Sequence, residues 1–208
     1  MTNWHAVVLD FDGTVVDSDD IKFEAFKILD SAFDMQGRIV EMASNGASRS
    51  KIASIIGNSS RNSASAEEVL SVFSDFVDGV ISLLPSKDGV VEFYETCVAN
   101  DVKIFINTAT PQHNINRIVE NRIEANFATS VFGGGTVNKA TRLVSILQYW
   151  NFDPQRVVVI GNGVDDQQSA DECGCVFWPT GDYPGNDAAL SFSEITEKLF
   201  GHNAKQIV

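Results

Sequence analysis

The sequence is poor in cysteine, histidine and basic residues, and each shortage excludes a class of protein. Its 208 residues include 15 lysines and arginines against 28 aspartates and glutamates, which gives a formal net charge of −13. Nucleic acids and anionic membrane surfaces bind clustered basic side chains. We therefore expect neither as a partner, and any phosphate binding must depend on a few local cations.

The cysteines and histidines form no pattern typical of a disulfide framework or a metal site. The three cysteines are an odd number without Cys-x-x-Cys spacing, so we expect reduced thiols packed in the interior. The three histidines are scattered along the chain, and we expect no function for them. No apolar run reaches membrane-spanning length, and the first one ends in a charge rather than continuing as a signal peptide. These features predict a cytoplasmic protein.

The first apolar run ends in two carboxylates. Residues 7–9 are typical of a strand buried on both faces, and Asp10 and Asp12 follow them directly. In open parallel sheets ligands bind at the carboxyl ends of the strands, and side chains two residues apart point the same way. Two like charges this close require a cation or a shared proton between them. A simple turn would explain Asp12 but not Asp10.

A second apolar run, residues 102–106, is followed by hydroxyl groups. Thr108 and Ala109 come first, and Thr110 and Pro111 then suit the cap and the first position of a helix. Such a turn presents Thr108 and free backbone N–H groups to a phosphate. A capped helix start with no ligand is the simpler alternative for this segment alone.

A third strand is predicted at residues 156–160, and acidic residues again follow it. Asn162, Asp165 and Asp166 lie in this segment, which taken alone could be an acidic loop. Between the second and third strands, the glycine-rich residues 133–135 precede Lys139 at the start of a predicted helix. A lysine there adds to the positive end of the helix dipole, which suggests an anionic partner, although for this segment taken alone a solvated lysine is the favoured interpretation.

The segment around Lys139 is not a P-loop. That motif requires glycine before the lysine and serine or threonine after it, whereas this chain has Asn138 and Ala140.

These four segments, in this order, resemble the four motifs of the haloacid dehalogenase-like superfamily, most of whose members are phosphohydrolases. The resemblance covers roughly residues 5 to 180. It implies that Asp10 is the nucleophile, that Asp12 is the general acid and base, and that Thr108 and Lys139 bind the transferring phosphoryl group, with Ala109 beside them. The second acid, Asp12, disfavours dehalogenase chemistry, because dehalogenase members lack it.

The resemblance also implies a Mg²⁺ cofactor. Its ligands would be Asp10, the backbone carbonyl of Asp12, Asn162 and Asp166. Asn162 departs from the family pattern, which has an acid there, and a neutral amide supplies less charge to the metal. The additional carboxylate of Asp165 is the expected compensator.

The predicted fold is α/β, a doubly wound parallel-sheet Rossmann-like core with an inserted helical cap. The core would comprise residues 1–16 and 86–208, and the cap residues 17–85. Residues 21–32 and 66–84 have helical patterns, and residues 65–68 form a capping box. The predicted hinges lie at residues 15–19 and 85–89.

The expected function is Mg²⁺-dependent hydrolysis of a small phosphorylated metabolite through an aspartyl-phosphate, by a monomer or homodimer. A sugar phosphomutase and a weakly active phospholigand-binding protein are the alternatives. Arg49 and Lys51, within residues 46–51, are the candidate residues for binding the leaving group. The equally weighted alternative is that they form the solvated start of a helix carrying Ile52, Ile55 and Ile56.

Overall fold

The computed structural model describes residues 4–45, 47, 49–59, 64–181 and 189–201. The chain divides into two compact units: Met1–Asp17 with Pro85–Val208, and Ser18–Leu84. We call these the sheet unit and the helical unit. None of the described helices is long and apolar enough to cross a bilayer.

The sheet unit contains a five-stranded parallel sheet. The strands are β1 (Ala6–Leu9), β2 (Lys103–Pro111), β3 (Ser130–Gly134), β4 (Val157–Gly161) and β5 (Val176–Pro179), in the spatial order β3-β2-β1-β4-β5. Val7 of β1 pairs with Ile104 on one side and with Val158 on the other. The central position of β1 explains why its sequence is fully apolar and fully buried. It also places the residue after β1 in the middle of the row formed by the carboxyl ends of the strands.

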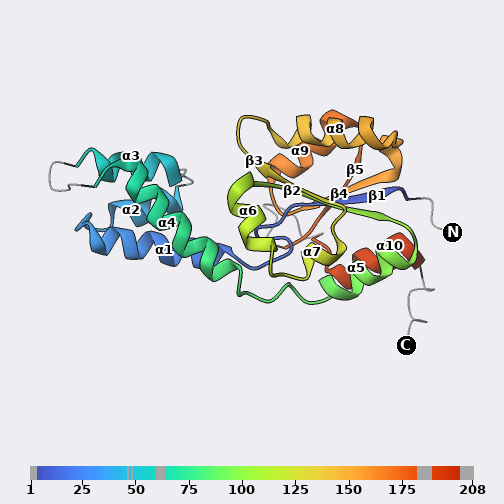
Figure 1. Ribbon diagram of the computed structural model, residues 1–208, viewed down its shortest axis with the longest axis horizontal. Helices are drawn as coiled ribbons and strands as arrows, with labels where there is room; N and C mark the ends of the chain where they lie inside the picture. The colour runs from blue at the N-terminus through green and yellow to red at the C-terminus, as the bar shows by residue number, and fades with distance from the viewer. Residues whose placement is uncertain (1–3, 46, 48, 60–63, 182–188, 202–208) are drawn as a thin grey trace. The chain divides into compact units, whose positions relative to one another are not determined.

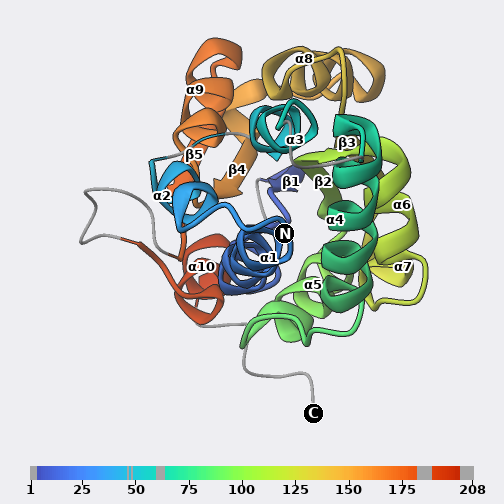
Figure 2. The ribbon, with the colours of Figure 1, turned by 90° about the vertical axis from the view of Figure 1, so that its left-hand side faces the viewer.

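Helices cover both faces of the sheet. They are α5 (Val90–Ala99), α6 (Gln112–Val119), α7 (Glu124–Phe127), α8 (Lys139–Trp150), α9 (Val164–Cys173) and α10 (Phe192–Phe200), with a short 3₁₀ helix at Pro154–Arg156. Figures 1 and 2 show α8 and α9 on one side of the sheet and α5 and α10 on the other. Alternate β1 residues, Ala6 and Val8, pack in one cluster with Leu143 and Ile146 of α8. The predicted doubly wound α/β fold is confirmed.

The helical unit consists of α1 (Asp19–Ala32), α2 (Arg38–Ser44), α3 (Arg49–Gly57) and α4 (Ala66–Ile81). The predicted capping box is present: the Glu68 N–H donates to Ser65 Oγ at 3.2 Å, and the Ser65 N–H donates to Glu68 Oε2 at 2.7 Å. The buried carboxylate of Asp30 accepts the Gly37 and Ile39 N–H groups, each at 2.7 Å, and so stabilises the start of α2. The helical pattern predicted at residues 21–32 places Ile21, Ala25, Ile28, Leu29 and Ala32 on one stripe. In the structure Ala25 and Leu29 of this stripe are buried, whereas Ile28 is 53% exposed.

All three cysteines are free thiols. Cys97 and Cys175 are buried, and Cys173 is half-buried, as expected for packing residues. Burial raises the pKa of the Cys175 thiol to about 12, which keeps it protonated at neutral pH.

Candidate active site

The carboxyl ends of the central strands bring the predicted polar residues together. Asp10 follows β1, Thr108 lies near the end of β2, Lys139 begins α8, and Asp166 lies in the first turn of α9 after β4. Gly13 adopts a φ of 73°, a conformation that favours glycine, and lets the chain turn away after the two acids. All four side chains at this edge are buried in the sheet unit.

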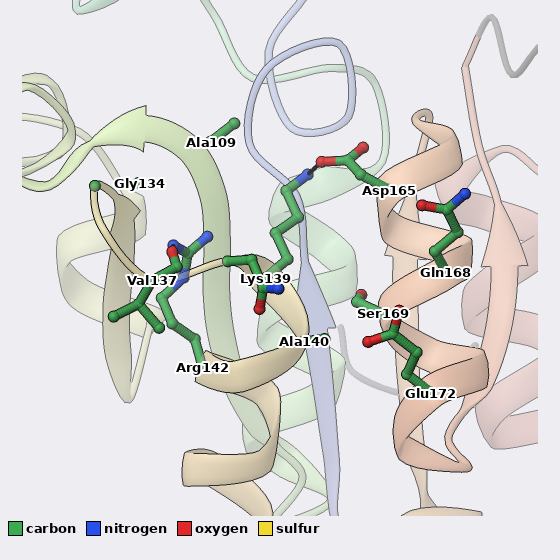
Figure 3. Close-up of a pocket in the computed structure, with 12 residues that line it drawn as sticks. Ala109, Gly134, Val137, Lys139, Ala140, Arg142, Asp165, Gln168, Ser169 and Glu172 are labelled. Carbon is green, nitrogen blue, oxygen red and sulfur yellow. Dashed lines mark hydrogen bonds and ion pairs between the residues drawn. The ribbon is translucent and has the colours of Figure 1, made fainter.

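Lys139 lies among three carboxylates. Its Nζ is 2.8 Å from Asp166 Oδ1, 3.0 Å from Asp165 Oδ2 and 3.3 Å from Asp10 Oδ1. Figure 3 shows the side chain extended toward Asp165. Burial alone would lower the pKa of Lys139, but the charges of Asp10 and then Asp166 outweigh it and raise the pKa above its usual range. The alternative of a solvated lysine is therefore wrong.

Asp10 carries an unfavourable charge. Its Oδ1 is buried and accepts no hydrogen bond. The ammonium of Lys139 forms an ion pair with this oxygen but does not donate a hydrogen bond to it. Burial and then the charge of Asp166 raise the pKa of Asp10 from 3.8 to about 7, against the opposing effect of Lys139. Burial also raises the pKa of Asp166. The two buried acids thus lack full compensation in the metal-free protein.

The side chain of Asp12 is held by the hydroxyl of Thr110, which the sequence predicted to be a helix cap. Thr110 Oγ1 donates to Asp12 Oδ2 at 2.6 Å. The prediction that Thr110 caps the next helix and Pro111 begins it is wrong, because β2 continues through Pro111 and α6 starts at Gln112. The Thr110 N–H donates to Thr108 Oγ1 at 3.1 Å, which leaves the Thr108 hydroxyl hydrogen available to a ligand.

The fourth segment places its three polar residues differently. Asn162 Oδ1 accepts from the Thr14 hydroxyl at 3.3 Å, next to the turn after Asp12. The Asp165 side chain is 56% exposed and contacts Lys139. The buried Asp166 carboxylate lies against Gly161, where a Cβ would come within 2.2 Å of its Oδ2. Only glycine leaves room for this carboxylate.

Two functional candidates, Arg142 and Asn107, were not predicted. Arg142 is buried, and its Nε donates to Asn107 Oδ1 at 2.7 Å while its Nη2 donates to the Thr108 carbonyl at 2.9 Å. Asn107 Nδ2 donates to the Lys139 carbonyl at 3.0 Å. The sequence did contain a signal, since Arg142 lies three residues after Lys139, on the same face of the helix.

A cavity of 320 Å³ lies between the start of α8 and α9 in the sheet unit (Figure 3). Lys139, Arg142 and Asp165 line it, and Ala109 lies at its edge near the end of β2. Ala109 is exposed, as a residue presenting backbone groups to a ligand would be. Of the predicted site residues of the sheet unit, Ala109, Lys139 and Asp165 line this cavity.

Arg49 and Lys51 lie in the helical unit, at the start of α3. Arg49 is half-buried and Lys51 is exposed, while Ile52 and Ile56 are buried. The helix start predicted as the alternative is therefore present, and a role in leaving-group binding stays a prediction. Gly46 and Ser48 of this candidate segment lie outside the described residues.

The donor set of the sheet unit fits a hard divalent cation. Among the described residues, no three histidine, cysteine or carboxylate side chains are grouped so that they alone could hold a metal. Mg²⁺, however, is usually bound by one or two carboxylates together with neutral oxygens and water. The orphaned Asp10 Oδ1 and the neighbouring Asp166 match that requirement.

Comparison with known proteins finds solved structures with a similar fold. A proposed beta-phosphoglucomutase from Thermotoga maritima is 21% identical, with a TM-score of 0.75 over 94% of this chain and 98% of that chain. CbbY from Rhodobacter sphaeroides, solved in complex with phosphate, is 13% identical, with a TM-score of 0.70 over 94% and 96%. A subfamily IA hydrolase from Geobacter sulfurreducens is 16% identical, with a TM-score of 0.71 over 95% and 97%.

At these identities the likeness shows the fold. No curated protein sequence matches the chain. The haloacid dehalogenase-like hydrolase family matches residues 4–174, and the protein belongs to that family.

Proposed function

We propose that the protein is a Mg²⁺-dependent phosphatase that hydrolyses a small phosphomonoester through an aspartyl-phosphate on Asp10. The observation that carries the proposal is the buried Asp10 carboxylate, 3.3 Å from Lys139 Nζ, with an oxygen that accepts no hydrogen bond. A carboxylate with a nearby cation and an unoccupied lone pair can act as a nucleophile toward phosphorus.

In the first step Asp10 attacks phosphorus, and the bond from phosphorus to the ester oxygen breaks. Asp12 gives its proton to the leaving oxygen, and the Thr110 hydroxyl keeps the Asp12 carboxylate oriented. In the second step a water molecule loses a proton to Asp12 and attacks the phosphorus, which releases phosphate and restores Asp10. The free hydroxyl hydrogen of Thr108 and the ammonium of Lys139 stabilise the negative oxygens of the phosphoryl group.

Mg²⁺ would be held by Asp10, Asp166, the Asn162 amide oxygen and the Asp12 carbonyl. When bound it supplies positive charge that offsets the repulsion between the nucleophile and a phosphate dianion. Charge balance supports this cofactor, because the charges that act on Asp10 are those of two carboxylates, Asp166 and Asp12, and one cation, Lys139.

We further propose that residues 1–16 and 86–208 form the catalytic core and that residues 17–85 form a cap that selects the substrate. Two connections join the units, and both are anchored in the sheet unit. Val16 bridges to Ser86, the Lys87 N–H donates to the Val15 carbonyl at 2.8 Å, and Lys87 Nζ donates to the Gly13 carbonyl at 2.6 Å. Movement of the cap would therefore begin beyond these residues.

A sugar phosphomutase would use the same nucleophile and general acid. The structural relative from Thermotoga maritima is described as a proposed beta-phosphoglucomutase. The two outcomes differ in their products, since a phosphatase releases inorganic phosphate and a mutase isomerises its substrate without net release. A binding protein would gain thermal stability from its ligand without turnover.

The test is a screen of phosphorylated sugars, phosphoglycolate, nucleotides and amino-acid phosphates for Mg²⁺-dependent phosphate release. We expect release from at least one small phosphomonoester, and loss of that release in Asp10→Asn. Near-normal release by Asp10→Asn would refute the mechanism, and isomerisation without release would favour the mutase.

A further inference from the structure

A buried guanidinium group lies behind the proposed phosphate site, and the proposed reaction does not use it. Arg142 is 8% exposed, although an arginine side chain is almost never buried unless it is paired with another group. It forms no ion pair with any carboxylate in the described ranges, so a neighbouring acid does not explain its burial. All three nitrogens of its fork donate hydrogen bonds to other parts of the chain.

The acceptors of these hydrogen bonds belong to separate chain segments. Nη2 donates to the carbonyl of Thr108 at 2.9 Å, and Nη1 donates to the carbonyl of Val137 in the loop before α8. Nε donates to Asn107 Oδ1 at 2.7 Å, and Asn107 in turn donates to the carbonyl of Lys139 at 3.0 Å. One side chain therefore joins the end of β2 to the start of α8.

Two of these anchored peptides carry the side chains proposed to bind the phosphoryl group, Thr108 and Lys139. A displacement of about 1 Å at such a group can cost roughly 100-fold in rate, because the catalytic groups must be oriented before the reaction. The planar fork of Arg142 holds its donors on three nitrogens in a fixed arrangement, whereas a lysine offers its three donors from a single nitrogen on a flexible stem.

We propose that Arg142, acting partly through Asn107, is a positioning residue that fixes Thr108 and Lys139 relative to each other. This inference rests on the proposed function, in which those two residues bind the phosphoryl group. The three hydrogen bonds of Arg142 end on groups of the chain itself, so the positioning of Thr108 and Lys139 does not depend on a contact between Arg142 and the substrate. The charge of Arg142 interacts with those of Asp10 and Asp165 without forming an ion pair, and it adds to the positive potential behind the phosphate site.

The experiment compares Arg142→Ala and Arg142→Lys with Ile146→Ala, a matched control. Ile146 is buried on the same helix, and its apolar side chain makes none of the hydrogen bonds that join Arg142 to Asn107, Thr108 and Val137. Each variant is assayed below its own melting temperature for kcat and KM. The accessibility of Lys139 is measured separately, from its acetylation by acetic anhydride, with peptide mass spectrometry as the readout.

We expect Arg142→Ala to lower kcat by about 10- to 100-fold with little change in KM. Arg142→Lys should lose nearly as much, and millimolar guanidinium should restore part of the activity of Arg142→Ala. Lys139 should be acetylated faster in Arg142→Ala than in the wild type or in Ile146→Ala. A loss of kcat no larger than that of Ile146→Ala, or unchanged acetylation of Lys139, would overturn the inference.

Failure of the proposed function has a different signature. If Lys139→Ala keeps full activity, or if the wild type hydrolyses nothing, the proposed reaction is wrong. The acetylation of Lys139 still decides whether Arg142 holds the start of α8, because it requires no turnover.

Discussion

Replacing Asp10 with asparagine should stabilise the metal-free protein at neutral pH while it removes activity. Burial and the charge of Asp166 raise the pKa of Asp10 from 3.8 to about 7. The contribution of Asp10 to stability is therefore fully present below pH 3.8 and is lost as the pH rises to about 7. At ~1.4 kcal/mol for each pH unit, the ionised carboxylate costs the folded state roughly 4 kcal/mol above pH 7. Relaxation and water entry reduce this, so we expect a gain of about 1–3 kcal/mol for Asp10→Asn.

The assay is urea denaturation in EDTA at several values between pH 5 and pH 8. The free energy of unfolding of Asp10→Asn should exceed that of the wild type by an amount that grows with pH. Asp101→Asn is the matched control, because Asp101 is 92% exposed and should show a small difference at every pH. A variant that is less stable than the wild type at pH 8, or a difference independent of pH, would refute the account of Asp10.

Three further predictions concern the metal, the cap and the α9 acid. Asn162→Asp should lower the Mg²⁺ concentration for half-maximal activity and Asp165→Asn should raise it; no change in either titration would remove the fourth segment from the metal site. Arg49→Ala should lower kcat/KM for the native substrate but not for an aryl phosphate, and equal losses on both would indicate a folding defect instead. Gly161→Ala places a Cβ 2.2 Å from Oδ2 of the buried Asp166 and should lower kcat about 100-fold. Gly79→Ala is the control and should leave kcat unchanged, because a Cβ at Gly79 would meet no atom within 4 Å. Normal activity of Gly161→Ala would show that this carboxylate need not stay in place.

Much of the fold was predictable because its signals are local. The apolar run of β1 and the capping box of α4 depend on neighbouring residues, and the structure contains both. The start of α6 was misplaced for the same reason. Thr110 and Pro111 are good cap residues locally, but the tertiary contact between Thr110 and Asp12 keeps them in β2.

The site residues that directly follow a strand were predictable from the sequence. The contacts between side chains of different helices and strands were not. Asp10 follows an evident strand, and the spacing of Arg142 from Lys139 puts both on one helix face. Nothing local indicates that Asp165 lies against Lys139, or which acceptor Arg142 reaches. The sequence predicted a helix beginning at Lys139, but not that Arg142 of this helix is buried. The predicted role of Arg49 in binding the leaving group is a claim about substrate selectivity. The Arg49→Ala assay tests it.

The most direct test of the central claim is to trap the phosphorylated residue. The enzyme is mixed with Mg²⁺ and a substrate found in the screen, quenched during turnover with borohydride, and digested for mass spectrometry. Borohydride reduces an acyl phosphate of aspartate to homoserine. The account predicts homoserine at position 10, dependent on substrate and absent from Asp10→Asn. Continued phosphate release with an unmodified Asp10, or homoserine at another acidic residue, would contradict it.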